Sequence, residues 1–203
     1  MTAVFLKTDK PGIFKCEFSD GSSLLMAVNY LPTGEFPSVW ESGRELSVKD
    51  EEDCRFASLC LRAEKIALRL IARAEQHSRG LTAKLERRGF KADVASAVVH
   101  NFQNRNMLDD RRYAERWIRS RLNLKKAPTP RWLYSSLGKR GIDRAEVKAA
   151  MGAVLDPETE FFLLQKYQER NKSPDSDKSG YIKFFLKNEG FSSTAIERFL
   201  DEE

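Results

Sequence analysis

The chain has 203 residues, of which 41% are hydrophobic and 32% are charged, which indicates one or two domains with a buried core and a large solvated surface. Its three cysteines, Cys16, Cys54 and Cys60, lack CxxC spacing, which argues against a disulfide framework or a zinc site and favours a reducing, cytoplasmic compartment. The longest apolar run, Leu24–Val28, is too short to cross a bilayer, and the first residues do not resemble a secretion signal, so no membrane association is expected.

The net charge of +5 is unevenly distributed along the chain. Residues 55–149 contain 23 Lys and Arg against 9 Asp and Glu, a net charge of +14. Residues 1–54 and 150–203 have net charges of −5 and −4. A strongly basic middle segment between two acidic ends favours a polyanionic partner, such as a nucleic acid or a nucleic acid complex, over a merely solvated helical surface.

The N-terminal part has the pattern of a β-hairpin. The apolar segments Phe14–Phe18 and Leu24–Val28 flank Asp20 and Gly21, a dipeptide typical of tight turns. We therefore expect a small hairpin extension over residues 1–54.

From about residue 55 the hydrophobic period is helical, and a pattern of Leu, three residues, glycine and an apolar residue occurs three times. The copies are LTAKLERRGF (Leu81–Phe90), LYSSLGKRGI (Leu133–Ile142) and IKFFLKNEGF (Ile182–Phe191). A glycine directly after a helix adopts a left-handed conformation that ends it, and the next residue packs back on the last helical turn. Each copy therefore predicts a helix, a glycine stop and a second helix.

A longer helix is predicted before each copy, at Phe56–Gln76, Asp110–Leu122 and Glu158–Arg170. The sequence thus predicts a mainly α fold with three tandem three-helix repeats, which form an elongated body beyond the hairpin. The expected boundaries are 55–106, 107–155 and 156–203. The segments Lys125–Pro130 and Asn171–Gly180 are predicted loops.

The stretch NMLDDRRYAERWI contains two adjacent carboxylates, Asp109 and Asp110. A helix that begins at Asp110 would place Asp109 at the N-cap, where its side chain accepts from free backbone N–H groups. Asp110 would then face the positive end of the helix dipole. A metal or acid–base site needs further ligands, and none is nearby in the sequence, so we interpret both residues as helix-start residues.

Cationic side chains recur at helical spacing on two of the predicted helices. On the first, the side opposite the cations is expected to hold Leu59, Ala63, Ile66, Leu70 and Ala74. The first helix carries the row Arg62, Lys65, Arg69 and Arg73, and the second carries the row Arg112, Arg116 and Arg119. Both rows, and the nearby cations Lys125, Lys126 and Arg131, are candidate contacts to phosphates or to a filament. For the aromatics Trp132 and Tyr134, packing is favoured over stacking on bases.

Signatures of enzymes are absent from the sequence. It contains neither a P-loop nor a GxGxxG segment, and His77 and His100 are not part of an HExxH pattern. Ser136 and Lys139 have SxxK spacing, but Ser136 lies inside a predicted repeat helix. We expect a protein that is not an enzyme and that uses neither a cofactor nor a metal.

Several segments resemble the RecX family of bacterial recombination regulators. They are HSRGLTAKLERRGF (His77–Phe90), MLDDRRYAERWIRSR (Met107–Arg121), PRWLYSSLGKRGI (Pro130–Ile142) and, before the first repeat, WESGREL (Trp40–Leu46). The resemblance covers residues 55–155 well and the third repeat more weakly. It implies a fold of three tandem three-helix repeats.

The resemblance further implies a monomeric, non-enzymatic negative regulator that binds the RecA filament on single-stranded DNA. Such a protein inhibits the recombinase, ATPase and co-protease activities of RecA in DNA repair and the SOS response, and binds single- and double-stranded DNA on its own. The alternative is a free-standing helical DNA-binding protein that acts without RecA. Against it, the helices after the glycines carry few base-reading side chains at their N-terminal ends.

Overall fold

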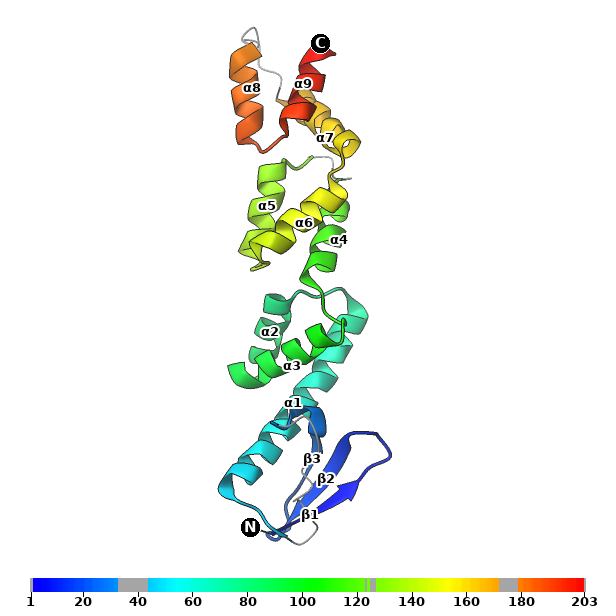
Figure 1. Ribbon diagram of the computed structural model, residues 1–203, viewed down its shortest axis with the longest axis vertical. Coiled ribbons are helices and arrows are strands. Elements are labelled where there is room, and N and C mark those ends of the chain that lie inside the picture. Colours follow the sequence, from blue (N-terminus) through cyan, green and yellow to red (C-terminus); the bar gives the residue numbers. More distant parts are fainter. Residues whose placement is uncertain (1, 33–43, 123, 125–126, 172–178, 203) are drawn as a thin grey trace. The chain divides into compact units, whose positions relative to one another are not determined.

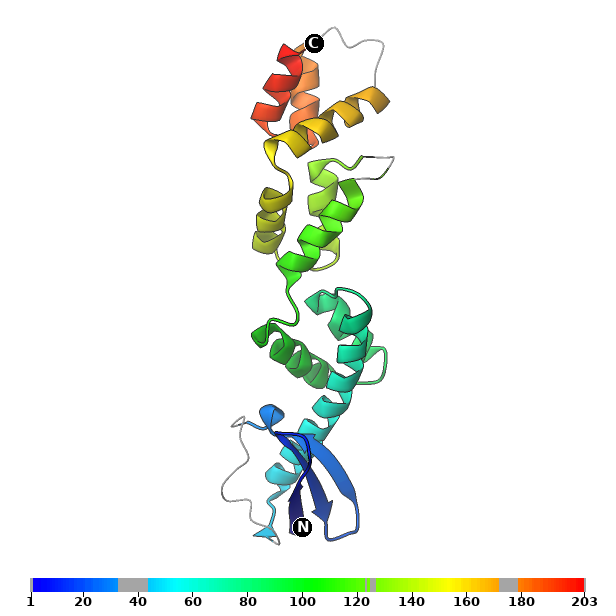
Figure 2. The same ribbon diagram turned by 90° about the vertical axis from the view of Figure 1, so that its right-hand side faces the viewer.

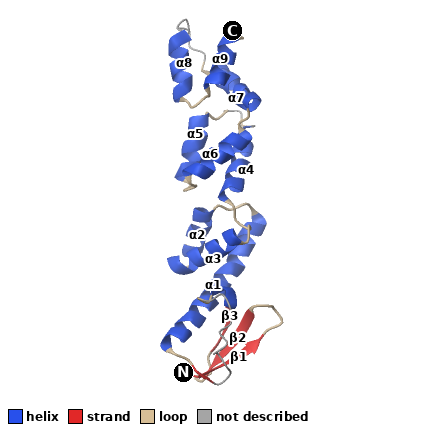
Figure 3. Ribbon diagram, viewed as in Figure 1, coloured by secondary structure: helices blue, strands red, loops and turns tan. Residues whose placement is uncertain are grey.

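The computed structural model describes residues 2–32, 44–122, 124, 127–171 and 179–202. Helices dominate this part of the chain, and a small sheet lies at the N-terminus (Figure 3). The chain divides into two compact units, Met1–Leu108 and Asp109–Glu203. The finer boundaries at residues 54, 106 and 155 stay a prediction. Residues 40–43 of the family-like segment Trp40–Leu46 and residues 172–178 of the predicted loop lie outside the described residues.

The N-terminal sheet contains the predicted hairpin and extends it. Strands β2 (Ile13–Phe18) and β3 (Ser23–Ala27) are antiparallel, as expected. Two further strands were not predicted, β1 (Thr2–Lys7) and the short β4 (Arg44–Glu45), and the described strands have the order β3-β2-β1-β4. Beyond β3 a short 3-10 helix, Val28–Tyr30, leads the chain out of the sheet.

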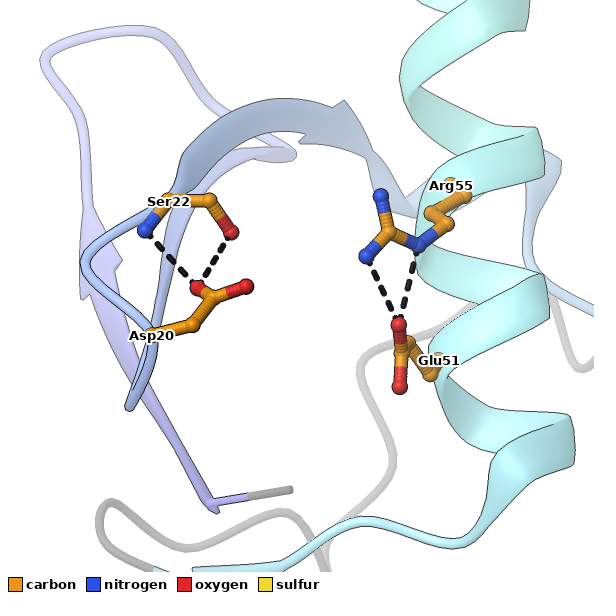
Figure 4. Close-up of polar contacts among 4 residues, drawn as sticks. All are labelled: Asp20, Ser22, Glu51 and Arg55. Atoms are coloured by element: carbon orange, nitrogen blue, oxygen red, sulfur yellow. Dashed lines mark hydrogen bonds and ion pairs between the residues drawn. The ribbon is translucent and has the colours of Figure 1, made fainter.

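The turn between β2 and β3 and the start of the first long helix are both held by carboxylates (Figure 4). The hydroxyl and backbone N–H of Ser22 donate to Oδ1 of Asp20 at 2.6 and 2.8 Å, and these bonds lower the pKa of Asp20. Arg55 donates to Oε1 of Glu51 at 3.0 and 2.7 Å. The Arg55 guanidinium also lies 5.4 Å from the centre of the Phe18 ring, so it connects the helix to the end of β2.

Helix α1 (Val48–Arg73) begins earlier than the predicted Phe56. The reason is a capping box, in which the N–H of Asp50 donates to the Ser47 hydroxyl and the N–H of Ser47 donates to the Asp50 carboxylate. The predicted apolar side of this helix is wrong at both of its ends, because Leu59 and Ala74 are exposed. The buried row instead runs through smaller residues: Cys54, Ala57, Cys60, Leu61, Ala63 and Ala67.

One core joins the sheet to three helices in the first unit. The N-terminal half of α1 lies beside the sheet, and α2 (Ser78–Glu86) and α3 (Ala92–Asn104) lie beside its C-terminal half (Figures 1 and 2). The fully buried Met26 of β3 and Phe102 of α3 belong to the same core. The small side chains on α1 let the sheet and the helices approach it closely.

The second unit contains six described helices around two neighbouring cores. The first core is built by α4 (Asp110–Leu122), α5 (Pro130–Lys139) and α6 (Arg144–Val154). The second is built by α7 (Pro157–Arg170), α8 (Ser179–Asn188) and α9 (Ser193–Asp201). Together with α1–α3 these helices confirm the predicted pattern of three-helix repeats.

The three predicted glycine stops are confirmed in geometry. Gly89, Gly141 and Gly190 have φ values of 87°, 82° and 89°. In each copy the residue after the glycine donates its N–H to the carbonyl of the repeat leucine, as in the bond of 3.4 Å from Phe90 to Leu85. The three repeat leucines, Leu85, Leu137 and Leu186, are fully buried. The glycine therefore ends each helix and brings the following apolar residue onto the core.

Candidate nucleic acid interface

The predicted cationic row of α1 lies on the solvent side of that helix. Arg62, Lys65, Arg69 and Arg73 are all exposed, because the buried row of small residues occupies the opposite side. Among the described residues, none of the four has a hydrogen bond or an ion pair. Like charges three and four residues apart on a helix repel each other, and phosphate groups bound along the row would relieve that repulsion.

The cationic row of α4 has a different environment. Arg116 and Arg119 are exposed, whereas Arg112 is half-buried. On the neighbouring side of the helix, Arg111 donates to Oε1 of Glu115 at 3.1 Å. This row therefore combines exposed cations with one that is partly packed.

The interpretation of Asp109 as a helix cap is confirmed. Its Oδ1 accepts from the backbone N–H of Arg112 at 2.9 Å, and α4 begins at Asp110. In the part of the chain that the structure describes, no group of three or more His, Cys, Asp or Glu side chains could hold a metal ion. Asp109 thus fixes the start of the helix that carries the second cationic row.

Arg131 is held by the neighbouring three-helix set. Its backbone N–H donates to the carbonyl of Glu189 at 2.9 Å, and its Nη1 donates to the carbonyl of Asn188 at 3.1 Å. Asn188 is the last residue of α8 and Glu189 follows it, so Arg131 joins the start of α5 to the end of α8. The remaining two predicted candidates, Lys125 and Lys126, lie outside the described residues.

The two aromatics near the start of α5 differ in their surroundings. Tyr134 is half-buried against the α4–α6 core, as predicted. Trp132 is 47% exposed, although its ring stacks on that of Trp117 with centroids 5.6 Å apart. The guanidinium groups of Arg121 and Arg140 lie 5.1 and 4.5 Å from the centre of the Trp117 ring. Packing thus accounts for one side of Trp132 and leaves the rest of the indole in solvent.

A cavity of about 560 Å³ lies beside Trp132 in the second unit. Its walls come from the segment before α5, from α5 itself, from α7 and from the end of α8: Leu124, Ala127, Pro128, Thr129, Trp132, Tyr167, Arg170 and Glu189. Burial, and then the nearby Glu189 carboxylate, raise the pKa of Tyr167, so its phenol is neutral at physiological pH. No local pattern of residues predicts this cavity, because its walls come from three segments that are separated along the chain.

The cysteines do not form a reactive surface site. All three are fully buried, and burial raises the pKa of the Cys60 thiol to about 12. The Cys16 and Cys54 thiols interact with each other, which raises the pKa of Cys54 and lowers that of Cys16. Within the described ranges, no helix is long and apolar enough to span a bilayer.

Comparisons with known proteins agree on one family. A family model described as the second three-helix domain of RecX matches residues 109–151. A regulatory protein RecX of Treponema pallidum (strain Nichols) is 30% identical over 149 residues, which cover 71% of this chain and 87% of that protein. A regulatory protein RecX of Thermobifida fusca is 30% identical over 149 residues, which cover 71% of this chain and 80% of that protein.

Two solved structures share the fold. A crystal structure of a regulatory protein RecX aligns with a TM-score of 0.65 at 18% identity, over 98% of this chain and 99% of that chain. The crystal structure of RecX from Lactobacillus salivarius aligns with a TM-score of 0.56 at 23% identity, over 72% of this chain and 97% of that chain.

Proposed function

The chain belongs to the RecX family of regulatory proteins, and from this premise we propose that it binds the RecA filament on single-stranded DNA and inhibits it without being an enzyme. The inhibited activities are strand exchange, ATP hydrolysis and co-protease action, in DNA repair and the SOS response. The partners are the filament and DNA itself.

The observation that carries this proposal is the cationic row of α1. Arg62, Lys65, Arg69 and Arg73 are exposed and lack partners within the described residues, so their charges are free to act on a ligand. A linear row suits the regular spacing of phosphates along a nucleic acid strand. Contacts of this kind position a protein on DNA without reading its sequence, which suits a regulator that acts along a filament.

A protein bound along the filament can inhibit RecA simply by occupying its binding site there. A protein that contacts phosphates with one side and RecA with another would oppose the addition of subunits or hold the filament in a state that does not exchange strands. Neither action needs a reacting group.

The direct test is the ATPase rate of RecA on single-stranded DNA, measured with and without this protein. The α1 row is tested by replacing Arg62, Lys65, Arg69 and Arg73 with glutamine, which preserves helix propensity. The expected result is weaker ATPase inhibition and a salt dependence of single-strand binding that is shallower by about 0.7 per lost contact. A control variant removes the same number of cations that already have carboxylate partners: Lys15, Arg55, Arg111 and Lys183.

Three outcomes count against the proposal. If the wild-type protein leaves the ATPase rate unchanged, it is not a filament inhibitor. If it also binds DNA tightly, the alternative of a DNA-binding protein that acts without RecA is correct. If the α1 variant and the control variant behave alike, the row is only a solvated surface.

A further inference from the structure

We propose that the cavity beside Trp132 binds one base of a single-stranded nucleic acid, stacked on the Trp132 ring, with the adjoining phosphate on Arg170. This inference rests on the proposed function and deepens it, because it adds a site for a base to the phosphate contacts of the cationic rows. Three features of the cavity favour a nucleotide: a fixed indole, a cation and an anion among its lining residues.

The Trp132 ring is held in place although 47% of the residue is exposed. Its backbone N–H donates to the Thr129 hydroxyl at 3.3 Å, which caps α5, and its ring stacks on Trp117 at an interplanar angle of 22°. The exposed part of the indole is available for stacking with a base, because every base has a π-face. A ring that is already fixed loses little conformational entropy when a base stacks on it.

The cavity walls facing a bound base are apolar and fixed. Ala127 and Pro128 are buried. Tyr167 is also buried, and its ring contacts Phe191 at a centroid distance of 5.9 Å. The cavity volume of about 560 Å³ is within the usual range for small-ligand sites, which is roughly 300–1,000 Å³. A base that enters this space would therefore be removed from water on both of its faces.

The charges at the cavity suit the two ends of a nucleotide. Arg170 is exposed, and its guanidinium lies 5.8 Å from the centre of the Tyr167 ring, where it can meet a phosphate. Glu189 is half-buried on the wall, and within the described residues its carboxylate has no hydrogen bond. It can accept from the exocyclic amine of a base and would repel a phosphate. The two charges thus orient the nucleotide in one direction.

A base fits these features better than a side chain of a protein partner. Arg121 and Arg140 lie over Trp117, which stacks on Trp132, so the aromatic surface is bordered by cations. Alternating aromatics and arginines are typical of surfaces that bind single strands by stacking and by charge. These residues lie in the basic middle segment of the chain, residues 55–149, whose net positive charge also favours a polyanion such as a nucleic acid strand.

The experiment measures the binding of Trp132→Ala to two single-stranded oligonucleotides of equal length, one with bases and one fully abasic. The variant should lose roughly 5- to 150-fold in affinity for the normal strand, the value of one stacked base. Its affinity for the abasic strand and the salt dependence of binding should stay unchanged, because no phosphate contact is lost. Trp132→Phe should restore part of the affinity.

Two further variants sharpen the test. Phe184→Ala removes an aromatic that is 65% exposed and does not line the cavity, so it should bind both strands as the wild type does. Arg170→Gln should lower the salt slope by about 0.7 with either strand. Thermal melts of all variants verify that they are folded.

Two results would overturn the inference while leaving the proposed function intact. One is equal loss of affinity for the normal and the abasic strand in Trp132→Ala. The other is a Trp132→Ala variant that binds single strands normally but no longer inhibits the RecA ATPase, because a protein side chain would then occupy the cavity. Failure of the proposed function is recognised separately, by a wild-type protein that does not change the ATPase rate.

Discussion

The hydroxyl of Tyr30 donates to Oε2 of Glu64 at 2.7 Å and accepts from the side-chain amide of Asn101 at 3.0 Å. This network joins the segment after β3 to both α1 and α3. Arg105 adds a contact to Oε1 of Glu64 at 3.3 Å. Burial raises the pKa of Tyr30 far above its ordinary value, so the phenol remains a donor at all physiological pH values.

The first prediction concerns this network. Tyr30→Phe should lower the free energy of unfolding of the first unit by about 1–2 kcal/mol, because the half-buried Glu64 and Asn101 lose their shared partner. Urea denaturation measures the change. Tyr134→Phe is the matched control, since the Tyr134 hydroxyl has no hydrogen bond within the described residues. Equal melts for the two variants would show that the network does not stabilise the fold.

The second prediction compares three glycines. Gly89→Ala should destabilise by about 1–2 kcal/mol, because its φ of 87° is unfavourable for alanine although the surrounding space is open. Gly190→Ala should cost more, because its added Cβ would lie 2.9 Å from the backbone nitrogen of Arg131. Gly138→Ala, inside α5 with open space, should stabilise by about 0.5–1 kcal/mol.

Urea melts should rank Gly138→Ala as the most stable variant, Gly89→Ala as intermediate and Gly190→Ala as the least stable. A Gly190→Ala protein as stable as Gly89→Ala would contradict the close approach of α8 to the start of α5. A destabilised Gly138→Ala protein would contradict the helical conformation at that position.

Local features of the fold were predictable because their causes are local. The glycine stops at Gly89, Gly141 and Gly190 depend on residues five apart, and the cap at Asp109 depends on residues three apart. The start of α1 was predicted too late, although the signal was present: Ser47 and Asp50 have the spacing of a capping box. Strand β1 pairs with the other edge of β2, a relationship that the hairpin pattern of β2 and β3 does not predict.

The candidate site could be predicted only in part. Spacing identified the exposed cations of α1, since the side of a helix follows from its period. It could not show that Arg131 binds the end of α8, or that Tyr167 and Glu189 lie near Trp132. Those relationships depend on how one three-helix set packs on the next, which no short segment encodes.

The third prediction tests the role of Asp109. Asp109→Ala should lower the free energy of unfolding by about 1 kcal/mol, because the N–H of Arg112 loses its acceptor, whereas Asp109→Asn should lose less. Inhibition of RecA should survive in both folded variants. A variant with an unchanged melt but no inhibition would show that the carboxylate acts on a partner and not as a cap.

The fourth prediction concerns acid stability at the start of α7. Oδ1 of Asp156 accepts from the N–H of Thr159 at 2.8 Å, and this bond lowers the pKa of Asp156 in the folded protein. A carboxyl group whose pKa is lower in the folded than in the unfolded protein stabilises the fold at pH values above its unfolded pKa. This stabilisation is lost as the pH falls through the folded pKa. The stability difference between wild type and Asp156→Asn should therefore shrink as the pH drops below about 4. A difference that stays constant from pH 7 to pH 2 would contradict it.

The last prediction separates two arginines that the sequence placed in one group. Arg131 donates to the Asn188 carbonyl, whereas Arg119 is exposed and has no hydrogen-bond or ion-pair partner within the described residues. Arg131→Gln should lower the free energy of unfolding by about 1.5–3 kcal/mol, the usual worth of a hydrogen bond from a charged group. Arg119→Gln should leave the melt unchanged, since glutamine is nearly as good a helix former as arginine.

Binding to single-stranded DNA should show the opposite pattern, with a change in Arg119→Gln and none in Arg131→Gln. Arg119→Gln should make the salt dependence shallower by about 0.7, because one phosphate contact is lost, and Arg131→Gln should leave the slope as it is. Urea melts and titrations at several salt concentrations measure both properties in the same samples. If Arg131→Gln changed the slope and kept the melt, its guanidinium would leave the end of α8 to bind DNA. If Arg119→Gln left the slope unchanged, its charge would lie outside the contact surface, and the α4 row would end at Arg116.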